Sequence, residues 1–147
     1  GLLSQKSYLK RTLNLRAEDR MLIVLDLDDF KYINDTYGHL TGDRCLKEIS
    51  DCLKRVYFHY GSCYRIGGDE FCVLLWDPEK EKFCKDKFYW LLEKRRKLID
   101  FLPEISYGSA LLIDQESIHD TKARADQRMY KNKKEHKANK QQKILNR

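Results

Sequence analysis

The sequence predicts a single α+β domain, an α/β sandwich in which helices surround a central mixed, mainly antiparallel sheet. Candidate strands and helices alternate along 147 residues, a length that suits one domain. Two candidate strands are separated only by a pair of glycines, and such a hairpin makes its strands antiparallel neighbours. The remaining connections contain helices, which favour parallel strands. Together these features are close to the split βαβ, ferredoxin-like plan.

The first strand is expected at Met21–Leu25, where five apolar residues follow one another. An acidic segment, 26–29, comes directly after it. Residues 30–43 are expected to form a short helix and a glycine-containing loop. Asp43 is then expected to cap a longer helix. That helix turns one apolar face toward the sheet, formed by Leu46, Ile49, Leu53 and Val56.

The hairpin is expected from the segments 62–66 and 70–76, which are joined at Gly67-Gly68. Glycines at this turn also remove side chains where a large ligand could approach the backbone.

Three further elements complete the pattern: a helix from Pro78 to about Leu102, a strand at 104–113 and a helix from Ile118 to about Lys137. The inner faces of the two helices are assigned to Cys84, Phe88, Leu91, Leu98 and Ile99, and to Ala125 and Met129.

The composition is typical of a soluble globular domain, with 41% hydrophobic and 35% charged residues. No apolar run is long enough to cross a bilayer, and no signal peptide is visible. Five cysteines without a C-x-x-C pair favour reduced thiols over disulfides or zinc. A cytoplasmic location is therefore expected for the domain, whether or not the full-length protein is attached to a membrane.

The net charge of +6 comes from residues 131–147, which hold seven Lys or Arg and one Glu. The remainder of the chain is neutral. A solvated helix face explains most of these lysines, and neither a nucleic-acid partner nor membrane contact by this domain is expected. The chain begins Gly-Leu-Leu-Ser, so we expect one domain, 1–147, excised from a longer protein.

Three carboxylates carry the candidate chemistry. Asp26 ends the first strand, and Asp69 and Glu70 lie at the hairpin tip. If the first strand lies beside the hairpin, these groups converge and repel one another unless a cation neutralises them. A site with a small number of protein ligands, all of them oxygen atoms, is typical of Mg²⁺ (or Mn²⁺) that substrate phosphates also bind. Such a site suggests phosphoryl or nucleotidyl transfer. The alternative for Asp69 and Glu70 is an ordinary hairpin tip.

Four segments resemble the GGDEF family of diguanylate cyclases. "RIGGDEF" is similar to the family's central motif, and "DLDDFKYINDTYGHLTGD" to its upstream segment. "ISYGSA" resembles its S-x-G strand, and "ARADQRMYKNKKEHK" its C-terminal helix. The resemblance covers nearly the whole chain in the right order. It implies a nucleotidyl-cyclase palm fold and a homodimer that condenses two GTP molecules, one per domain, to cyclic di-GMP with release of pyrophosphate.

The resemblance also implies residue roles. Asp26, Asp69 and the backbone carbonyl of Leu27 would bind the metal. Glu70 would be either the general base for the attacking 3′-hydroxyl or a second metal ligand, two roles that we weigh equally. The residues implied in GTP binding are Asn34 and Asp43 for guanine, His39 and Phe30 near the nucleotide, Gly67 and Gly68 at the loop, and Lys133 and Lys137 for the phosphates. Lys133 would also act in catalysis, and Phe30 could instead be ordinary core.

Three departures from the family pattern stand out. The R-x-x-D of the product-inhibition site is replaced by residues 58–61, so no feedback inhibition through that site is expected. The N-terminal motif is incomplete, with Ser4 and Gln5 where Asn and Arg are usual. Lys137 replaces a frequent Arg. The changed opening and Lys137 leave an alternative open: a catalytically weak GTP-binding module that regulates an attached partner domain. A polymerase-like palm would use the same kind of carboxylate-bound metal, but the sequence has no aromatic-rich groove for binding a nucleic-acid strand.

Overall fold

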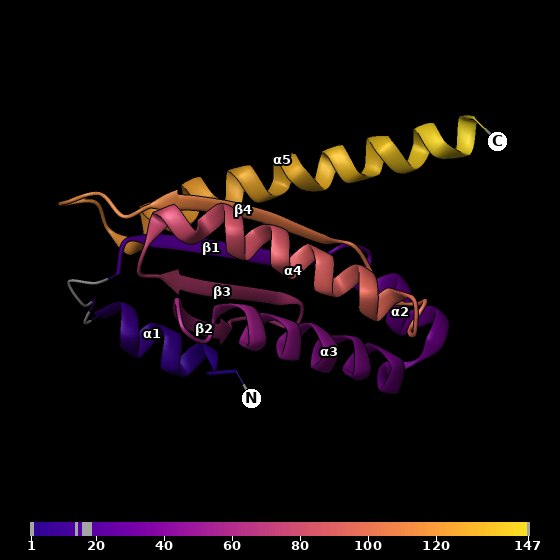
Figure 1. Cartoon of the computed structure of the whole chain (residues 1–147), viewed down its shortest axis with the longest axis horizontal. Helices are drawn as coiled ribbons and strands as arrows, with labels where there is room; N and C mark the ends of the chain where they lie inside the picture. The colour runs from indigo at the N-terminus through magenta and orange to yellow at the C-terminus, as the bar shows by residue number, and fades with distance from the viewer. Residues whose placement is uncertain (1, 14, 16–18, 147) are drawn as a thin grey trace.

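The structure is a computed structural model that describes residues 2–13, 15 and 19–146, so the two ends of the predicted domain, 1 and 147, lie outside the described residues. Helices surround one four-stranded sheet (Figure 1). The elements are α1 (Gln5–Leu13), β1 (Met21–Leu27), α2 (Phe30–Tyr37), α3 (His39–Tyr57), β2 (Gly61–Arg65), β3 (Glu70–Leu75), the 3-10 helix η1 (Pro78–Lys80), α4 (Glu81–Arg96), β4 (Ile105–Leu111) and α5 (Ile118–Leu145).

The sheet has the strand order β2-β3-β1-β4, and each neighbouring pair is antiparallel. The helical crossovers α2–α3 and α4 join strands that point the same way but are not neighbours, because β3 lies between β1 and β2, and β1 between β3 and β4. The α+β class and the split βαβ plan are therefore confirmed. In the described chain the parallel component is limited to one isolated bridge, Leu3 to Tyr64.

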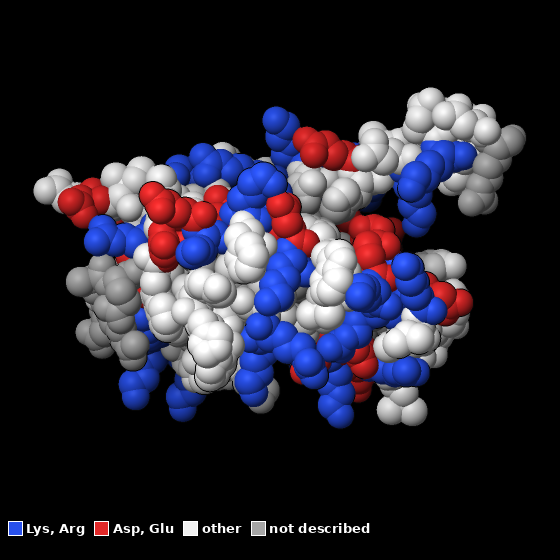
Figure 2. Space-filling model, viewed as in Figure 1, with Lys and Arg blue, Asp and Glu red and all other residues white. Residues whose placement is uncertain are grey.

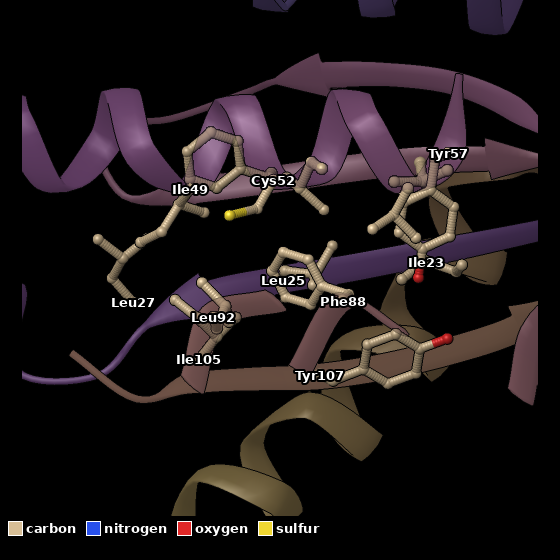
Figure 3. Close-up of a cluster of buried hydrophobic side chains, with 14 of the residues drawn as sticks. Ile23, Leu25, Leu27, Ile49, Cys52, Tyr57, Phe88, Leu92, Ile105 and Tyr107 are labelled. Atoms are coloured by element: carbon tan, nitrogen blue, oxygen red, sulfur yellow. The ribbon is translucent and has the colours of Figure 1, made fainter. Parts of the chain in front are cut away.

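The two faces of the sheet carry separate cores. Alternate residues of β1, including Ile23 and Leu25, pack with α3 and α4. Figure 3 shows these strand residues facing Ile49 of α3 and Phe88 of α4. The predicted apolar face of α3 is confirmed, since all four of its residues are buried.

The opposite face packs against α1 and α5. Leu22 and Val24 of β1 share this core with Ala125 and Met129, the two residues predicted to face inward from the last helix. Gly108 of β4 allows the close approach of α5, because a Cβ at this position would lie 2.1 Å from the backbone oxygen of Ala125. The β1 residue that follows on this face is Asp26, so the strand directs its first acid toward α5.

Several helix boundaries differ from the prediction. Gly38 caps α3, which begins at His39, so the prediction that Asp43 caps this helix was wrong. The left-handed backbone at Gly38, with φ 91°, favours glycine and separates α2 from α3. The helix expected from Pro78 is shorter, since α4 ends at Arg96. Leu98 consequently lies outside the helix and is 86% exposed, contrary to its assignment to the inner face.

Helices without an apolar stripe were the hardest to predict. Helix α1 had not been predicted; its N-terminus is capped by the Ser4 hydroxyl, which accepts a hydrogen bond from the Ser7 amide. Tyr8 anchors the helix through an edge-on ring contact with Tyr64. Helix α5 continues to Leu145, past the predicted end at Lys137, with exposed polar residues on all sides.

The hairpin loop spans residues 66–69 rather than a two-residue turn. The Ile66 and Gly67 amides both donate to the Glu70 carbonyl. All five cysteines are free thiols, as predicted. Among the described helices, none combines the length and apolar character needed to cross a membrane.

Candidate active site

The first carboxylate of the site stands at the end of β1, on the face that packs against α5. Asp26 is the direct cross-strand partner of Glu70 on β3 and of Ser106 on β4. Directly opposed residues of antiparallel strands project from the same face. The sheet therefore brings Asp26 and Glu70 together, as the sequence predicted.

Asp26 is held in a partly buried ion pair. The Lys133 ammonium lies 2.9 Å from Asp26 Oδ2, while Asp26 Oδ1 is buried and has no hydrogen-bond partner in the described structure. Burial and, to a lesser extent, the neighbouring Asp69 raise the pKa of Asp26 to about 6, although Lys133 lowers it. Although burial lowers the pKa of Lys133, the hydrogen bond to Asp26 and the charges of the nearby aspartates together raise it. A second cation at Asp26 would relieve this electrostatic cost.

The two acids of the hairpin are held differently. The backbone carbonyl of Asp69 accepts a hydrogen bond from the Leu27 amide at 3.2 Å, which fixes the loop against the end of β1. The Glu70 carboxylate lies 3.0 Å from Lys122, which also contacts Asp126 at 2.9 Å. Although burial opposes it, hydrogen bonding to Asp126 and Glu70 raises the pKa of Lys122. Helix α5 thus supplies a lysine to each of the two opposed strand acids.

This donor set fits a hard divalent cation. Within the described residues, no three His, Cys, Asp or Glu side chains are gathered closely enough to form a metal-binding group. The buried, unpaired Oδ1 of Asp26 nevertheless offers a ligand oxygen, and the other candidate donors are carboxylate and carbonyl oxygens. Asp26, Asp69 and the Leu27 carbonyl are the groups that could hold Mg²⁺ or Mn²⁺.

A third acid, Asp28, belongs to a buried network that the sequence did not predict. Its carboxylate contacts the Ser106 hydroxyl at 2.5 Å and His136 Nδ1 at 2.7 Å. Because Ser106 and His136 lie 78 and 108 residues away along the chain, local spacing held no signal for this network.

The predicted guanine-binding residues lie on α2 and α3. Asn34 packs against Gly42, where a Cβ would be 1.9 Å from Asn34 Oδ1 and 3.3 Å from the Phe30 ring. Asp43, the next residue, is exposed and lines a pocket of about 790 Å³. The remainder of that lining comes from Leu2, Leu40, Arg44, Leu46, Lys47, Ser50, Asp51, Lys54 and Arg65. A carboxylate in the lining of a pocket suits recognition of a base that donates two hydrogen bonds.

Among the described residues, Asp43 is the one predicted nucleotide contact that lines that pocket. His39 is exposed at the start of α3 and lines neither of the two described pockets. Lys137 is exposed and borders a different pocket of about 540 Å³, together with Asp28 and His136. Figure 2 shows a hollow between the body and the projecting end of α5, on a face with many Lys and Arg side chains. Phe30 also packs partly against the core, so both of its predicted roles stay open.

The loop that contains Gly67 and Gly68 is held by Arg65 and has open space beside Gly68. Arg65 donates to the carbonyl oxygens of Gly67 and Gly68 at 3.2 and 2.8 Å. A Cβ added at Gly68 would meet no atom within 4 Å. The absence of a side chain here therefore serves no packing purpose within the domain, which leaves room for a ligand.

The segment that replaces the family's inhibitory motif is built differently. Phe58 is exposed and its ring packs edge-on against His59, with centroids 5.0 Å apart. Gly61 lies so close to β3 that a Cβ would be 2.3 Å from the Leu74 carbonyl oxygen. An acidic side chain at position 61 would require the strands to separate. The predicted absence of feedback inhibition remains a prediction.

Comparison with known proteins identifies the family. The profile described as "Diguanylate cyclase, GGDEF domain" matches residues 4–139. "Diguanylate cyclase DgcN" of Escherichia coli K12 is 36% identical over 118 residues, which are 76% of this chain and 29% of that protein. "Probable diguanylate cyclase DgcI" of the same organism is 32% identical over 138 residues, 90% of this chain and again 29% of the relative.

Solved structures agree with this assignment. The GGDEF domain of DgcB from Caulobacter crescentus, in complex with c-di-GMP, superposes with a TM-score of 0.69 at 27% identity, covering 90% of this chain and 86% of that one. Diguanylate cyclase SiaD from Pseudomonas aeruginosa, in complex with its activator SiaC, superposes with a TM-score of 0.74 at 25% identity. The superposition covers 91% of this chain and 56% of that one. The chain belongs to the GGDEF family, and it spans less than a third of the length of the two curated relatives.

Proposed function

We propose that this GGDEF domain is a diguanylate cyclase, which condenses two GTP molecules to cyclic di-GMP and pyrophosphate in a Mg²⁺-dependent reaction between two copies of the chain. The observation that carries the proposal is the Asp26 carboxylate: partly buried, with one oxygen unpaired, opposed to Glu70 and within reach of Lys133. Relatives named as diguanylate cyclases support it.

The cation held by Asp26, Asp69 and the Leu27 carbonyl would neutralise the triphosphate and stabilise charge in the transition state. Asp43 and Asn34 would orient the guanine, with the carboxylate accepting from N1–H and the exocyclic amine. Lys133 would exchange Asp26 for phosphate oxygens and stabilise the negative charge on the departing pyrophosphate.

Glu70 would accept the proton of the attacking 3′-hydroxyl as that oxygen bonds to the α-phosphorus of the second GTP. The bond between the α- and β-phosphates breaks, and pyrophosphate leaves. A second, reciprocal attack closes the ring. Each copy presents a single set of these residues, so turnover requires two copies face to face. Flanking sensor or partner domains of a longer protein would control the association of the two copies.

The experiment uses the domain fused to a dimerising coiled coil, incubated with GTP and Mg²⁺, with nucleotides separated by chromatography and identified by mass. Cyclic di-GMP and pyrophosphate in a ratio of about one to two are expected from the reaction. Glu70→Gln should lower the rate by about 10²- to 10⁴-fold if Glu70 is the general base. Calorimetry with a non-hydrolysable GTP analogue separates the alternatives: binding without product supports the GTP-binding regulator, and no binding contradicts both.

A further inference from the structure

We propose that His136 is a positioning residue of this site: by holding Asp28, it fixes both the end of β1 that carries Asp26 and the turn of α5 that carries Lys133. The kinetic consequences of this inference rest on the proposed function, whereas its structural consequences do not.

Asp28 depends on two side chains that come from different elements. It is 9% exposed, and each carboxylate oxygen has its own partner, Ser106 Oγ on Oδ1 and His136 Nδ1 on Oδ2. Among the ion pairs of the described residues, His136 is the one basic partner of Asp28. A buried carboxylate is stable only when it is hydrogen-bonded and balanced by a donor of this kind.

This network reaches the metal-binding edge through the backbone. Asp28 follows Asp26 by two residues, and the Asp28 amide donates to the Glu104 carbonyl at 2.9 Å. Ser106 is both the cross-strand partner of Asp26 and the donor to Asp28. Leu27, whose carbonyl is a candidate ligand, thus lies between two residues that are tied to β4 and α5.

The same imidazole sets the position of the helix. His136 lies three residues after Lys133, one turn along the same side of α5. One residue before Lys133, the Asn132 side chain accepts a hydrogen bond from the Tyr107 amide at 2.9 Å. The C-terminal end of α5 projects beyond the sheet (Figure 1), and the next ion pair of the helix after His136, Lys140 to Asp29, is longer at 3.7 Å. His136 is therefore the last close anchor before the projecting end.

Loss of the imidazole would leave a buried carboxylate without its basic partner and would free the last anchored turn. Residues that orient the ligands of a metal site typically affect metal affinity or activity by about 10- to 100-fold. A displacement of about 1 Å in the Lys133 ammonium would be sufficient for such a loss.

The test compares His136→Ala with His119→Ala, a matched change at an exposed histidine of the same helix. The first measurement is the acylation rate of Lys133 in nucleotide-free protein, followed by peptide mass spectrometry. A rise of about three- to tenfold is expected in His136→Ala and no change in His119→Ala, because the Asp26 pair normally protects the amine. The second measurement is kcat/KM for GTP in the dimerised domain, where a fall of about tenfold is expected only in His136→Ala.

Two conservative variants separate positioning from simple packing. In His136→Asn the amide nitrogen occupies the place of Nδ1, so Lys133 protection and kcat/KM should return to near wild type. In His136→Gln the amide lies one bond further out, and both should remain impaired. Equal Lys133 reactivity in wild type and His136→Ala would overturn the proposal. Equal Lys133 reactivity and equal kcat/KM in the Asn and Gln variants would also overturn it. If the Ala variant does not fold, the comparison of the Asn and Gln variants decides whether His136 has this role. If wild type makes no product, the proposed function fails, while Lys133 reactivity still decides the role of His136.

Discussion

The packing of α5 on the sheet makes Gly108→Ala the most informative stability variant. A Cβ at Gly108 would lie 2.1 Å from the Ala125 oxygen and 2.4 Å from the Met129 nitrogen, whereas real Cβ atoms essentially never come closer than 3.0 Å. The helix backbone would have to retreat by at least 3.0 − 2.1 = 0.9 Å, because backbone atoms cannot rotate away as a side chain can.

Overpacking of this kind costs about 1–3 kcal/mol, and a retreat of α5 also opens space beside buried Met129. We therefore expect Gly108→Ala to lower the free energy of unfolding by about 2–4 kcal/mol, a large part of the 5–15 kcal/mol of a typical domain. Replacing glycine by alanine also lowers the conformational entropy of the unfolded chain, which usually stabilises a protein by about 0.4–1 kcal/mol and offsets part of this loss.

The assay is urea unfolding followed by circular dichroism, with Gly68→Ala as the control. Gly68 has open space around its Cβ position, so the same substitution should change stability by less than about 1 kcal/mol. A Gly108→Ala variant that is as stable as the Gly68→Ala variant would refute the close packing of α5 on β4.

Three further outcomes follow from burial, ion pairing and metal binding. Phe88→Ala should lower the unfolding free energy by about 3–5 kcal/mol, whereas Phe83→Ala on the exposed side of α4 should cost less than about 1 kcal/mol; equal losses in urea unfolding would contradict the packing of α4. A hydrogen bond from Arg95 lowers the pKa of Asp51, so the stability that Asp51 adds relative to Asp51→Asn should be present above pH about 4 and vanish at lower pH. Parallel pH profiles of the two proteins would exclude that contribution. Mg²⁺ with a GTP analogue should raise the Tm of wild type but not of Asp26→Asn in thermal scans, and an equal rise in both would exclude Asp26 as a metal ligand.

The parts of the fold that the sequence predicted are those with a clear hydrophobic period. The buried run Met21–Leu25, the apolar face of α3, and Ala125 and Met129 of α5 all behave as their spacing indicates. The glycine pair marked the hairpin, although the loop proved to be four residues long.

The errors occurred where other interactions decide the structure. Helix α1 is held by a serine cap and a tyrosine contact, and the end of α5 is exposed and mostly polar, so neither shows an apolar stripe. The true start of α3 depends on the left-handed Gly38, which left Asp43 inside the helix and free to line a pocket.

The candidate site was predicted in part. The pairing of Asp26 with Glu70 followed from strand order, and Lys133 from the resemblance to the family. The ion pair of Lys122 with Glu70 and the network of Asp28 with His136 depend on where α5 crosses the sheet, which only the three-dimensional packing determines.

Random mixing of active and inactive copies tests the central claim, condensation of two GTP molecules by two copies of the chain. Wild type and Asp69→Asn, fused to the same exchangeable dimerising coiled coil, are mixed in varying proportions at constant total protein. Because each product molecule needs two intact sites, the rate of cyclic di-GMP formation should fall with the square of the wild-type fraction, to about a quarter in an equal mixture. A linear fall, to about half, would contradict a reaction shared between two copies.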